Sequence, residues 1–356
     1  MNQKLSYRKR ILLYLLLLIF LWICFALNYE NADTYSYKLI YSGVYKTEPL
    51  FAMICAFFYN NGFAYHIFVI FCATSTLLIF AFTLYQYTRT PFGVLLLFFI
   101  YPFFYYVVGL RNALGFSLVF FATRYLIRKG PINIIKYIIF IGVATLIQNS
   151  LFFYIVLLLV KIKQPNKNFL KLLLSFLFIS ILVFNFGLLP LFLNMLDKSS
   201  RLYKRLAQKS LAGFTISTIL QMFCVLHSTL IFNKCSKYID DIKDYRILDS
   251  ISKYVYISAF LIIFYIHDSI FYRLNYNMLI FSYILMDIVY TNPKIYWKGK
   301  EKYLYIGLSA GLILTHVLYY SILGNYQLLA KQIFFNNYFF DFLFLKWRVI
   351  NERRYI

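Results

Sequence analysis

Arg111 is the charged residue whose position most demands an explanation. It stands between two apolar runs, residues 98–110 and 113–126. A charge placed among apolar segments is costly and tends to mark a functional site. The planar guanidinium presents a fork of donors that suits phosphate. The sequence therefore predicts that Arg111 binds an anion, and the structural alternative is a side chain that snorkels to lipid head groups.

A second polar cluster occupies residues 266–276 and contains His267, Asp268 and Arg273. Arg273 could bind a phosphate together with Arg111. His267 could act as a catalytic base, because an imidazole changes its charge near neutral pH. The structural alternative is a polar loop between two membrane spans.

Asp33, Tyr37, Tyr41 and Tyr45 follow one another at steps of four residues. On a helix these four side chains would share one face. We expect the three tyrosines to bind sugar rings beside the carboxylate of Asp33. The alternative is an interfacial helix that its tyrosine rings anchor to the membrane.

Glu48 precedes Pro49 and an apolar stretch, residues 50–59, which ends at an Asn-Asn-Gly sequence. These signals predict a helix start and a helix stop. The resulting helix is too short to cross a bilayer, which takes roughly 20 residues. We therefore expect a re-entrant or interfacial helix near 49–60, with Glu48 as a candidate catalytic carboxylate at the mouth of a cavity.

The segment 190–211 is strongly basic. Its cationic residues are Lys198, Arg201, Lys204, Arg205 and Lys209. On the outer face such a segment would attract lipid phosphate or an acidic glycan, so Arg201 and Arg205 are candidate pyrophosphate ligands. The alternative is that this segment lies inside and that the predicted topology is wrong by one crossing.

The composition decides which elements hold these residues. Hydrophobic residues make up 62% of the 356 residues and charged residues only 14%, whereas soluble domains average about 25% charged residues. A soluble enzyme, a disordered chain and a secreted disulfide scaffold are excluded. The fold class is an all-α polytopic membrane protein with about 10–12 transmembrane helices. The predicted spans are 11–28, 63–85, 92–109, 112–128, 132–147, 150–161, 169–189, 211–232, 253–268, 273–290, 303–322 and 332–345.

The net charge of +23 comes from 36 Lys and Arg against 13 Asp and Glu. Most basic residues lie in the short connections between apolar runs, which is typical of cytoplasmic loops rather than of a nucleic-acid site. One topology places these connections and both termini in the cytoplasm. The chain is then a single transmembrane domain, 1–356, with outer loops at 28–62 and 190–211.

Several other chemistries lack their motifs in the sequence. It contains no P-loop, no HExxH helix, no GxSxG elbow and no DxD pair, and its five cysteines form no CxxC pair. We therefore expect no metal site, no disulfide framework and no thiol nucleophile.

These residues together resemble a known family, the EpsG-like, Wzy-type polysaccharide polymerases of bacterial capsules and exopolysaccharides. The resemblance covers most of the chain. It rests on Asp33, Tyr37 and Glu48-Pro49, then Phe-Phe-Tyr-Tyr at 103–106, Arg111-Asn112-Ala113-Leu114, the segment 144–150, and Phe271-Tyr272-Arg273-Leu274-Asn275-Tyr276.

The resemblance implies a glycosyltransferase in the bacterial cytoplasmic membrane, with its active site facing outward. Its donor would be an oligosaccharide repeat linked to undecaprenyl pyrophosphate, and it would need no metal and no other cofactor. Arg111 and Arg273 would hold the pyrophosphate. Asp33 and Glu48 would orient or deprotonate the acceptor hydroxyl. Membrane lipids are the expected surroundings, and a chain-length regulator is left open as a partner.

One departure from the family pattern concerns residues 148–150. The family often has an H-x-S sequence where this chain has Gln148-Asn149-Ser150. Glutamine cannot act as a base at neutral pH. Either that histidine is not the catalytic base, or His267 or an acid replaces it, or the activity of this chain has changed.

Three other functions compete with polymerisation. A flippase for lipid-linked oligosaccharides would also carry charges within the membrane, but it would often show matched repeats, and none is found here. A polysaccharide ligase would use similar groups. An O-acyltransferase would want a central histidine, for which His316 is the candidate.

Overall fold

The computed structural model describes residues 2–88, 90–162, 171, 175, 211–239, 241–262, 272–292, 294–297, 299–323 and 326–343. Within these ranges the chain is helical, and its one extended pairing is an isolated bridge between Asn28 and Asn337. The protein is an all-α polytopic membrane protein, as predicted. The chain divides into two compact units, which are described separately: Met1–Arg124, Lys136–Phe152 and His316–Ile356 form the first, and Tyr125–Ile135 and Phe153–Thr315 the second.

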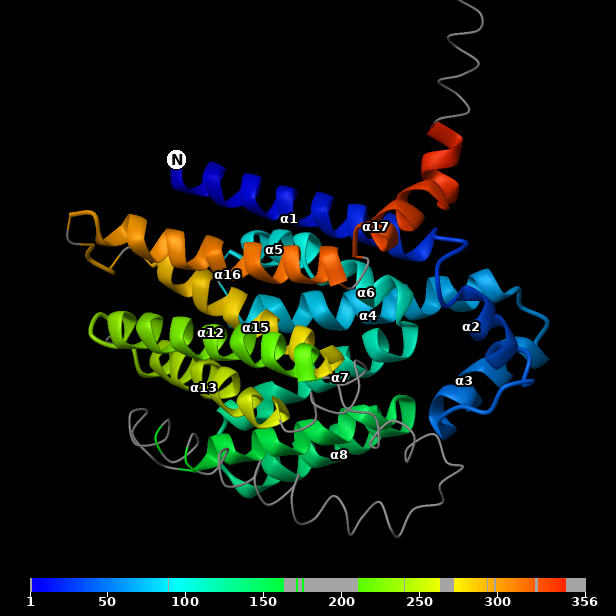
Figure 1. Cartoon of the computed structure of the whole chain (residues 1–356), viewed down its shortest axis with the longest axis horizontal. Coiled ribbons are helices and arrows are strands. Elements are labelled where there is room, and N and C mark those ends of the chain that lie inside the picture. The colour runs from blue at the N-terminus through cyan, green and yellow to red at the C-terminus, as the bar shows by residue number, and fades with distance from the viewer. Residues whose placement is uncertain are drawn as a thin grey trace, which may run out of the picture. The chain divides into compact units, whose positions relative to one another are not determined.

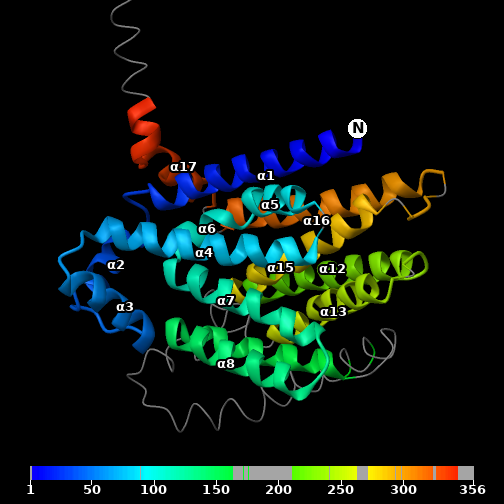
Figure 2. The same cartoon turned by 180° about the vertical axis from the view of Figure 1, so that it is seen from behind.

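The first unit is built on a long N-terminal helix and the helices that contact it. The elements are α1 (Asn2–Ala26), α2 (Thr34–Tyr41), α3 (Pro49–Asn60), α4 (Tyr65–Tyr87), α5 (Pro91–Ile100), α6 (Phe103–Val108) and α17 (Tyr326–Phe335), with α7 (Leu110–Ile127) as far as Arg124 and α8 (Pro131–Ile147) from Lys136. Helix α1 contacts α4, α5 and α17, and α2 contacts α3. Figures 1 and 2 both place α2 and α3 beyond the start of α4.

The second unit contains α12 (Leu211–Cys235), α13 (Ile242–Ser258), η3 (Ala259–Leu261), α15 (Tyr272–Thr291) and α16 (Glu301–Leu323) as far as Thr315. Helices α12, α13 and α15 contact one another. Some polar side chains inside this unit are paired: Lys234 Nζ lies 2.6 Å from Glu301 Oε2, and His227 Nε2 lies 2.8 Å from Ser309 Oγ. Such contacts reduce the cost of burying these polar atoms away from water.

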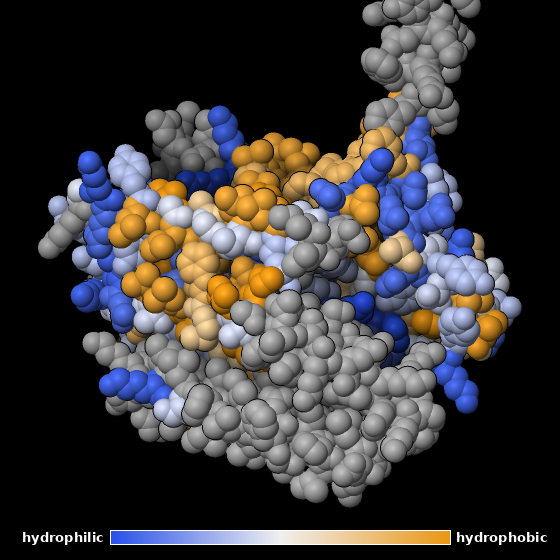
Figure 3. All heavy atoms as spheres, viewed as in Figure 1, coloured by the Kyte–Doolittle hydropathy of each residue, from blue (hydrophilic) through white to orange (hydrophobic). Residues whose placement is uncertain are grey.

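Apolar side chains remain exposed along several helices, for example Leu12 and Leu16 on α1 and Leu78 on α4. Figure 3 shows apolar side chains gathered over the middle of the described face and hydrophilic ones toward its sides. Among the described residues, three segments are long and apolar enough to cross a bilayer, namely Lys9–Ala26, Tyr65–Tyr87 and Ile216–Cys235. The full number of crossings stays a prediction.

The predicted short helix near 49–60 is confirmed as α3, which has 12 residues. The predicted span over 92–109 is not one continuous helix, because α5 ends at Ile100 and α6 begins at Phe103. Pro102 causes this break, since proline lacks an N–H donor and disfavours helical backbone at the preceding residue. The Tyr326 hydroxyl donates to the carbonyl of Ile100 at 3.0 Å, so one carbonyl at the end of α5 is satisfied by a side chain.

Two further boundaries differ from the prediction. The last predicted span, 332–345, is interrupted, because α17 ends at Phe335 and a separate helical turn covers residues 338–343. Helix α13 begins at Ile242, well before the predicted start at residue 253. Charged residues mark where an apolar stretch stops, but Lys and Arg, which occur in the early part of α13, are good helix formers, so the helix can continue through them. The predicted span 169–189 lies outside the described residues, apart from residues 171 and 175.

Candidate functional site

Arg111 lies in the first turn of α7, where backbone N–H groups have no partner inside the helix. Its backbone N–H donates to the Tyr37 hydroxyl at 3.3 Å. Its guanidinium carbon lies 5.8 Å from the centroid of the Tyr37 ring, a cation–π distance. Tyr37 comes from the buried face of α2.

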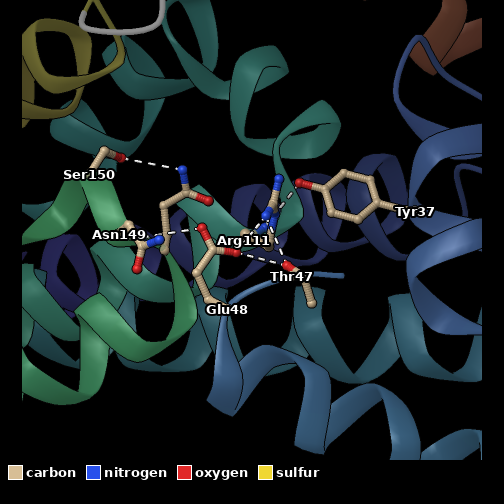
Figure 4. Close-up of polar contacts among 7 residues, drawn as sticks. Tyr37, Thr47, Glu48, Arg111, Asn149 and Ser150 are labelled. Atoms are coloured by element: carbon tan, nitrogen blue, oxygen red, sulfur yellow. Dashed lines mark hydrogen bonds and ion pairs between the residues drawn. The ribbon is translucent and has the colours of Figure 1, made fainter. Parts of the chain in front are cut away.

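Glu48 and Thr47 hold the Arg111 side chain from the opposite side, as Figure 4 shows. Arg111 Nη1 lies 2.5 Å from Glu48 Oε2 and donates to Thr47 Oγ1 at 2.9 Å. The Thr47 hydroxyl in turn donates to Glu48 Oε2 at 2.7 Å. Glu48 sits in extended backbone immediately before α3, which begins at Pro49. Pro49 favours this extended backbone at Glu48, because proline disfavours helical backbone at the residue before it.

A third segment reaches the same carboxylate. The backbone N–H of Asn149 donates to Glu48 Oε1 at 3.3 Å. Asn149 begins η1 (Asn149–Lys161), which follows α8 after the single residue Gln148. The Gln148 side chain donates to Ser150 Oγ at 3.3 Å, and Figure 4 shows this turn facing Glu48. The three sequence motifs around Glu48, Arg111 and residues 148–150 thus converge on one site.

The electrostatics of Glu48 follow from these contacts. Its side chain is 10% exposed, and that of Arg111 is 25% exposed. Burial by itself would raise the pKa of Glu48. The Arg111 charge and the hydrogen bonds from Thr47 and Arg111 outweigh burial and bring the pKa below its ordinary value. Glu48 is therefore ionised at neutral pH and is a weak base.

One hydrogen-bond donor of the Arg111 guanidinium is left unsatisfied. Its Nε atom is buried and has no hydrogen-bond partner among the described residues. A buried donor without an acceptor costs about 1–3 kcal/mol. An anion that accepts from Nε would remove this cost and would add a charge-assisted hydrogen bond.

The predicted face with Asp33 and the three tyrosines is only partly formed. Helix α2 ends at Tyr41, so Tyr45 does not continue the face and is 49% exposed. Tyr41 is buried, and its hydroxyl donates to the carbonyl of Phe63 at 2.5 Å. Asp33 lies at the start of α2, and its side chain makes no capping hydrogen bond. Of these four residues, the structure places Tyr37 in contact with Arg111.

The remaining predicted site residues lie in the second unit or outside the described residues. Arg273 lies half-buried in the first turn of α15, which belongs to the second unit. His267, Arg201 and Arg205 lie outside the described residues. His316 is buried and lies 6.1 Å from the Tyr101 ring.

Sequence reasoning missed two members of the site as functional residues. Thr47 has no role in the sequence-based prediction, and Asn149 enters it only as part of a departure from a family pattern. Thr47 touches both charged partners, and Asn149 contributes its backbone rather than its side chain. The sequence could have indicated Thr47, because it directly precedes the carboxylate of Glu48. It could not have indicated Asn149, because a backbone contact does not depend on the residue type.

Comparison with known proteins identifies the family of the chain. The family model described as the EpsG family matches residues 11–344, which is nearly the whole chain. No curated protein and no solved structure matches it. The matched region contains all residues that converge around Arg111. The chain belongs to the EpsG family of Wzy-like polysaccharide polymerases.

Proposed function

We propose that this chain joins undecaprenyl-pyrophosphate-linked oligosaccharide repeats into a capsular or exopolysaccharide glycan on the outer face of the bacterial cytoplasmic membrane. Membership of the EpsG family supports polymerase activity. The basic connections between apolar runs support the orientation. The observation that carries the lipid-pyrophosphate donor is Arg111, which is held by Glu48 and Thr47 and whose Nε is buried without a hydrogen-bond partner among the described residues.

In the proposed reaction, the hydroxyl oxygen of an acceptor sugar attacks the anomeric carbon of the donor sugar. A glycosidic C–O bond forms, the bond from that carbon to the pyrophosphate breaks, and undecaprenyl pyrophosphate leaves with the electron pair. Arg111 Nε donates to a phosphate oxygen as this charge develops. Fixed donors in a poorly solvated site stabilise such a charge more than water does.

The two carboxylates take different roles in this proposal. Glu48 already accepts hydrogen bonds from Arg111, Thr47 and Asn149, so we assign it to positioning Arg111. Asp33 makes no ion pair with the described residues and lies one helical turn before Tyr37 on α2. Residues four apart on a helix lie on one face. Asp33 is therefore the better candidate to accept the proton of the attacking hydroxyl.

The test compares a deletion strain complemented with wild-type protein, Arg111→Ala, Arg111→Lys or Arg128→Ala. Arg128 is an exposed arginine just beyond α7 and serves as the matched control. Lipid-linked glycans are sized by mass spectrometry, and a membrane-impermeant periodate treatment of intact cells reports the leaflet. Single repeats should accumulate on the outer leaflet and long polymer should disappear in Arg111→Ala. Arg111→Lys should also fail, since an ammonium lacks the Nε edge.

Two outcomes would overturn the proposal. Repeats that accumulate on the inner leaflet would identify a flippase. Long polymer that persists on the lipid without reaching its final acceptor would identify a ligase. Arg128→Ala should make polymer at the wild-type level, provided that immunoblots show equal amounts of each variant in the membrane.

A further inference from the structure

A second aromatic cluster lies in the first unit and is formed by residues other than those that hold Arg111. The Tyr338 ring centroid lies 4.9 Å from that of Tyr29 and 4.9 Å from that of His66. These residues come from three segments: the connection after α1, the first turn of α4, and the turn after α17. Tyr338 is 54% exposed, so much of this ring remains accessible.

The backbone around the two tyrosines is held rigidly. Asn28 and Asn337 form the isolated bridge, and both are buried. The Tyr29 N–H donates to the carbonyl of Asn336 at 3.0 Å, and the Asn28 side chain donates to the same carbonyl at 2.8 Å. The Tyr338 N–H donates to the carbonyl of the residue before Asn28 at 3.1 Å. Side chains mounted on such a locked backbone are pre-organised for binding.

Polar groups surround the rings. Partial burial and then the neighbouring carboxylate of Asp341 raise the pKa of the Tyr29 hydroxyl, and Glu30, which is exposed, adds to the effect. His66 Nε2 is buried and has no hydrogen-bond partner among the described residues. The cluster therefore combines an accessible aromatic surface, two carboxylate acceptors and an unused imidazole nitrogen.

We propose that Tyr29, Tyr338 and His66, flanked by Glu30 and Asp341, form a carbohydrate subsite that binds the glycan chain during polymerisation. A sugar ring has apolar C–H faces that can lie on an aromatic ring, and hydroxyl donors at its edge that suit carboxylates. The inference rests on the proposed function, because it needs a chain that handles glycans. It gives the polymer a holding point separate from Arg111.

The charges of the cluster argue against a lipid anchor. Tyrosines at a membrane interface often sit among head groups. The chain as a whole has a net charge of +23, yet the groups beside these two rings are the acidic Glu30 and Asp341. Carboxylates repel the phosphates of lipid head groups but accept hydrogen bonds from neutral hydroxyls.

The experiment compares Tyr338→Leu, Tyr338→Phe and Tyr35→Leu in the full-length protein. Tyr35 is 73% exposed on α2 and is the matched control. The probe is a set of oligosaccharides prepared by partial depolymerisation of the strain's own polysaccharide. Binding to protein in nanodiscs is followed by saturation-transfer-difference NMR, and polymer length by gel electrophoresis. Tyr338→Leu should weaken binding by about tenfold and shorten the polymer, since it removes the flat ring.

Tyr338→Phe keeps the ring and should stay close to wild type, and Tyr35→Leu should match wild type. Equal binding and equal polymer length in Tyr338→Leu and Tyr338→Phe would overturn the proposed subsite, because an apolar side chain without a ring would then be sufficient. If Tyr338→Leu does not fold, Asp341→Asn replaces it as an isosteric variant, and unchanged binding there would also count against the proposal.

The same strains separate this inference from the proposed function. Polymer of normal length and amount in Arg111→Ala would contradict the proposed function, whatever the result for the Tyr338 variants. Loss of polymer in Arg111→Ala together with wild-type binding and length in Tyr338→Leu would remove only the subsite.

Discussion

Arg111 Nη1 lies 2.5 Å from Oε2 of Glu48, although 63 residues separate the two in the sequence. The pair joins the start of α7 to the start of α3. Because each residue lies at the start of a helix, a small shift of either helix would change the position of the Arg111 guanidinium relative to Glu48. The predictions below test what this pair and its neighbours do.

Glu48→Gln should destabilise the protein and should also lower polymer synthesis per folded molecule. The amide cannot balance the charge of Arg111, and loss of one partner from a mostly buried pair costs about 1–3 kcal/mol after allowance for partial exposure. The measurements are thermal unfolding in detergent and polymer yield normalised to protein amount. Glu301→Gln, which breaks the pair with Lys234 in the second unit, is the control. It should reduce stability while leaving normalised yield unchanged, and equal yields in the two variants would contradict a special role for Glu48.

The contribution of Glu48 to stability should depend on pH. Its pKa in the folded protein is lower than its ordinary value of 4.5, so the folded state binds this proton less readily than the unfolded state. The stabilisation is therefore fully present above the ordinary value and is lost as the pH falls through the lower, folded value. The difference in Tm between wild type and Glu48→Gln should be constant above about pH 6 and should shrink below about pH 4. A difference that grows on acidification would contradict the ion pair.

Tyr37→Phe should reduce polymerase activity, whereas Tyr41→Phe should leave activity per folded molecule unchanged. The first change removes the acceptor for the backbone N–H of Arg111 but keeps the ring beside the guanidinium. An unsatisfied buried donor costs about 1–3 kcal/mol, so we expect a loss of about tenfold in rate. The Tyr41 hydroxyl donates to the carbonyl of Phe63, and its ring packs in an aromatic cluster. Initial rates with purified lipid-linked repeats check both variants, and equal losses would show that the effect is one of packing.

Gly115→Ala should disturb the turn that carries Asn149. A Cβ on Gly115 would collide with the side chain of Leu151, which is fully buried next to that turn. Overpacking of this kind costs about 1–3 kcal/mol. Activity and thermal stability should both fall, and the second substitution Leu151→Ala should restore part of the activity. Gly142→Ala on α8, where a Cβ would meet nothing within 4 Å, should be neutral, and the absence of rescue by Leu151→Ala would count against this explanation.

Much of the architecture could be read from local chemistry. The apolar runs predicted the helices α1, α4, α7 and α8 to within a few residues at most ends, with α1 extending further into its basic start. Pro49 and an Asn-Gly stop predicted α3 in the same way. Helix boundaries failed where a polar pair or a proline inside an apolar run broke the helix, as at Pro102 and at Asn336-Asn337, because hydropathy averages over such single residues.

The candidate site was only partly predictable. Arg111 and Glu48 could be selected because charged residues are rare in this chain, and a rare residue type can be recognised from the sequence alone. Tyr37 and Tyr41 are both buried on α2, as a shared helix face predicts, but the Tyr37 hydroxyl meets the backbone of Arg111 whereas that of Tyr41 bonds to the carbonyl of Phe63. A four-residue spacing predicts a shared helix face but not what lies opposite each turn of that face.

The sequence by itself determined that this is an all-helical membrane protein, and it singled out the arginine and the carboxylate that its chemistry would need. Composition and local helix signals act over a few residues, so they can be read along the chain. The tertiary structure alone decided that Thr47, Glu48, Arg111 and the N–H of Asn149 meet, and that Tyr29 and Tyr338 lie side by side. Those contacts depend on how distant helices pack and on where each helix stops, which no local pattern encodes.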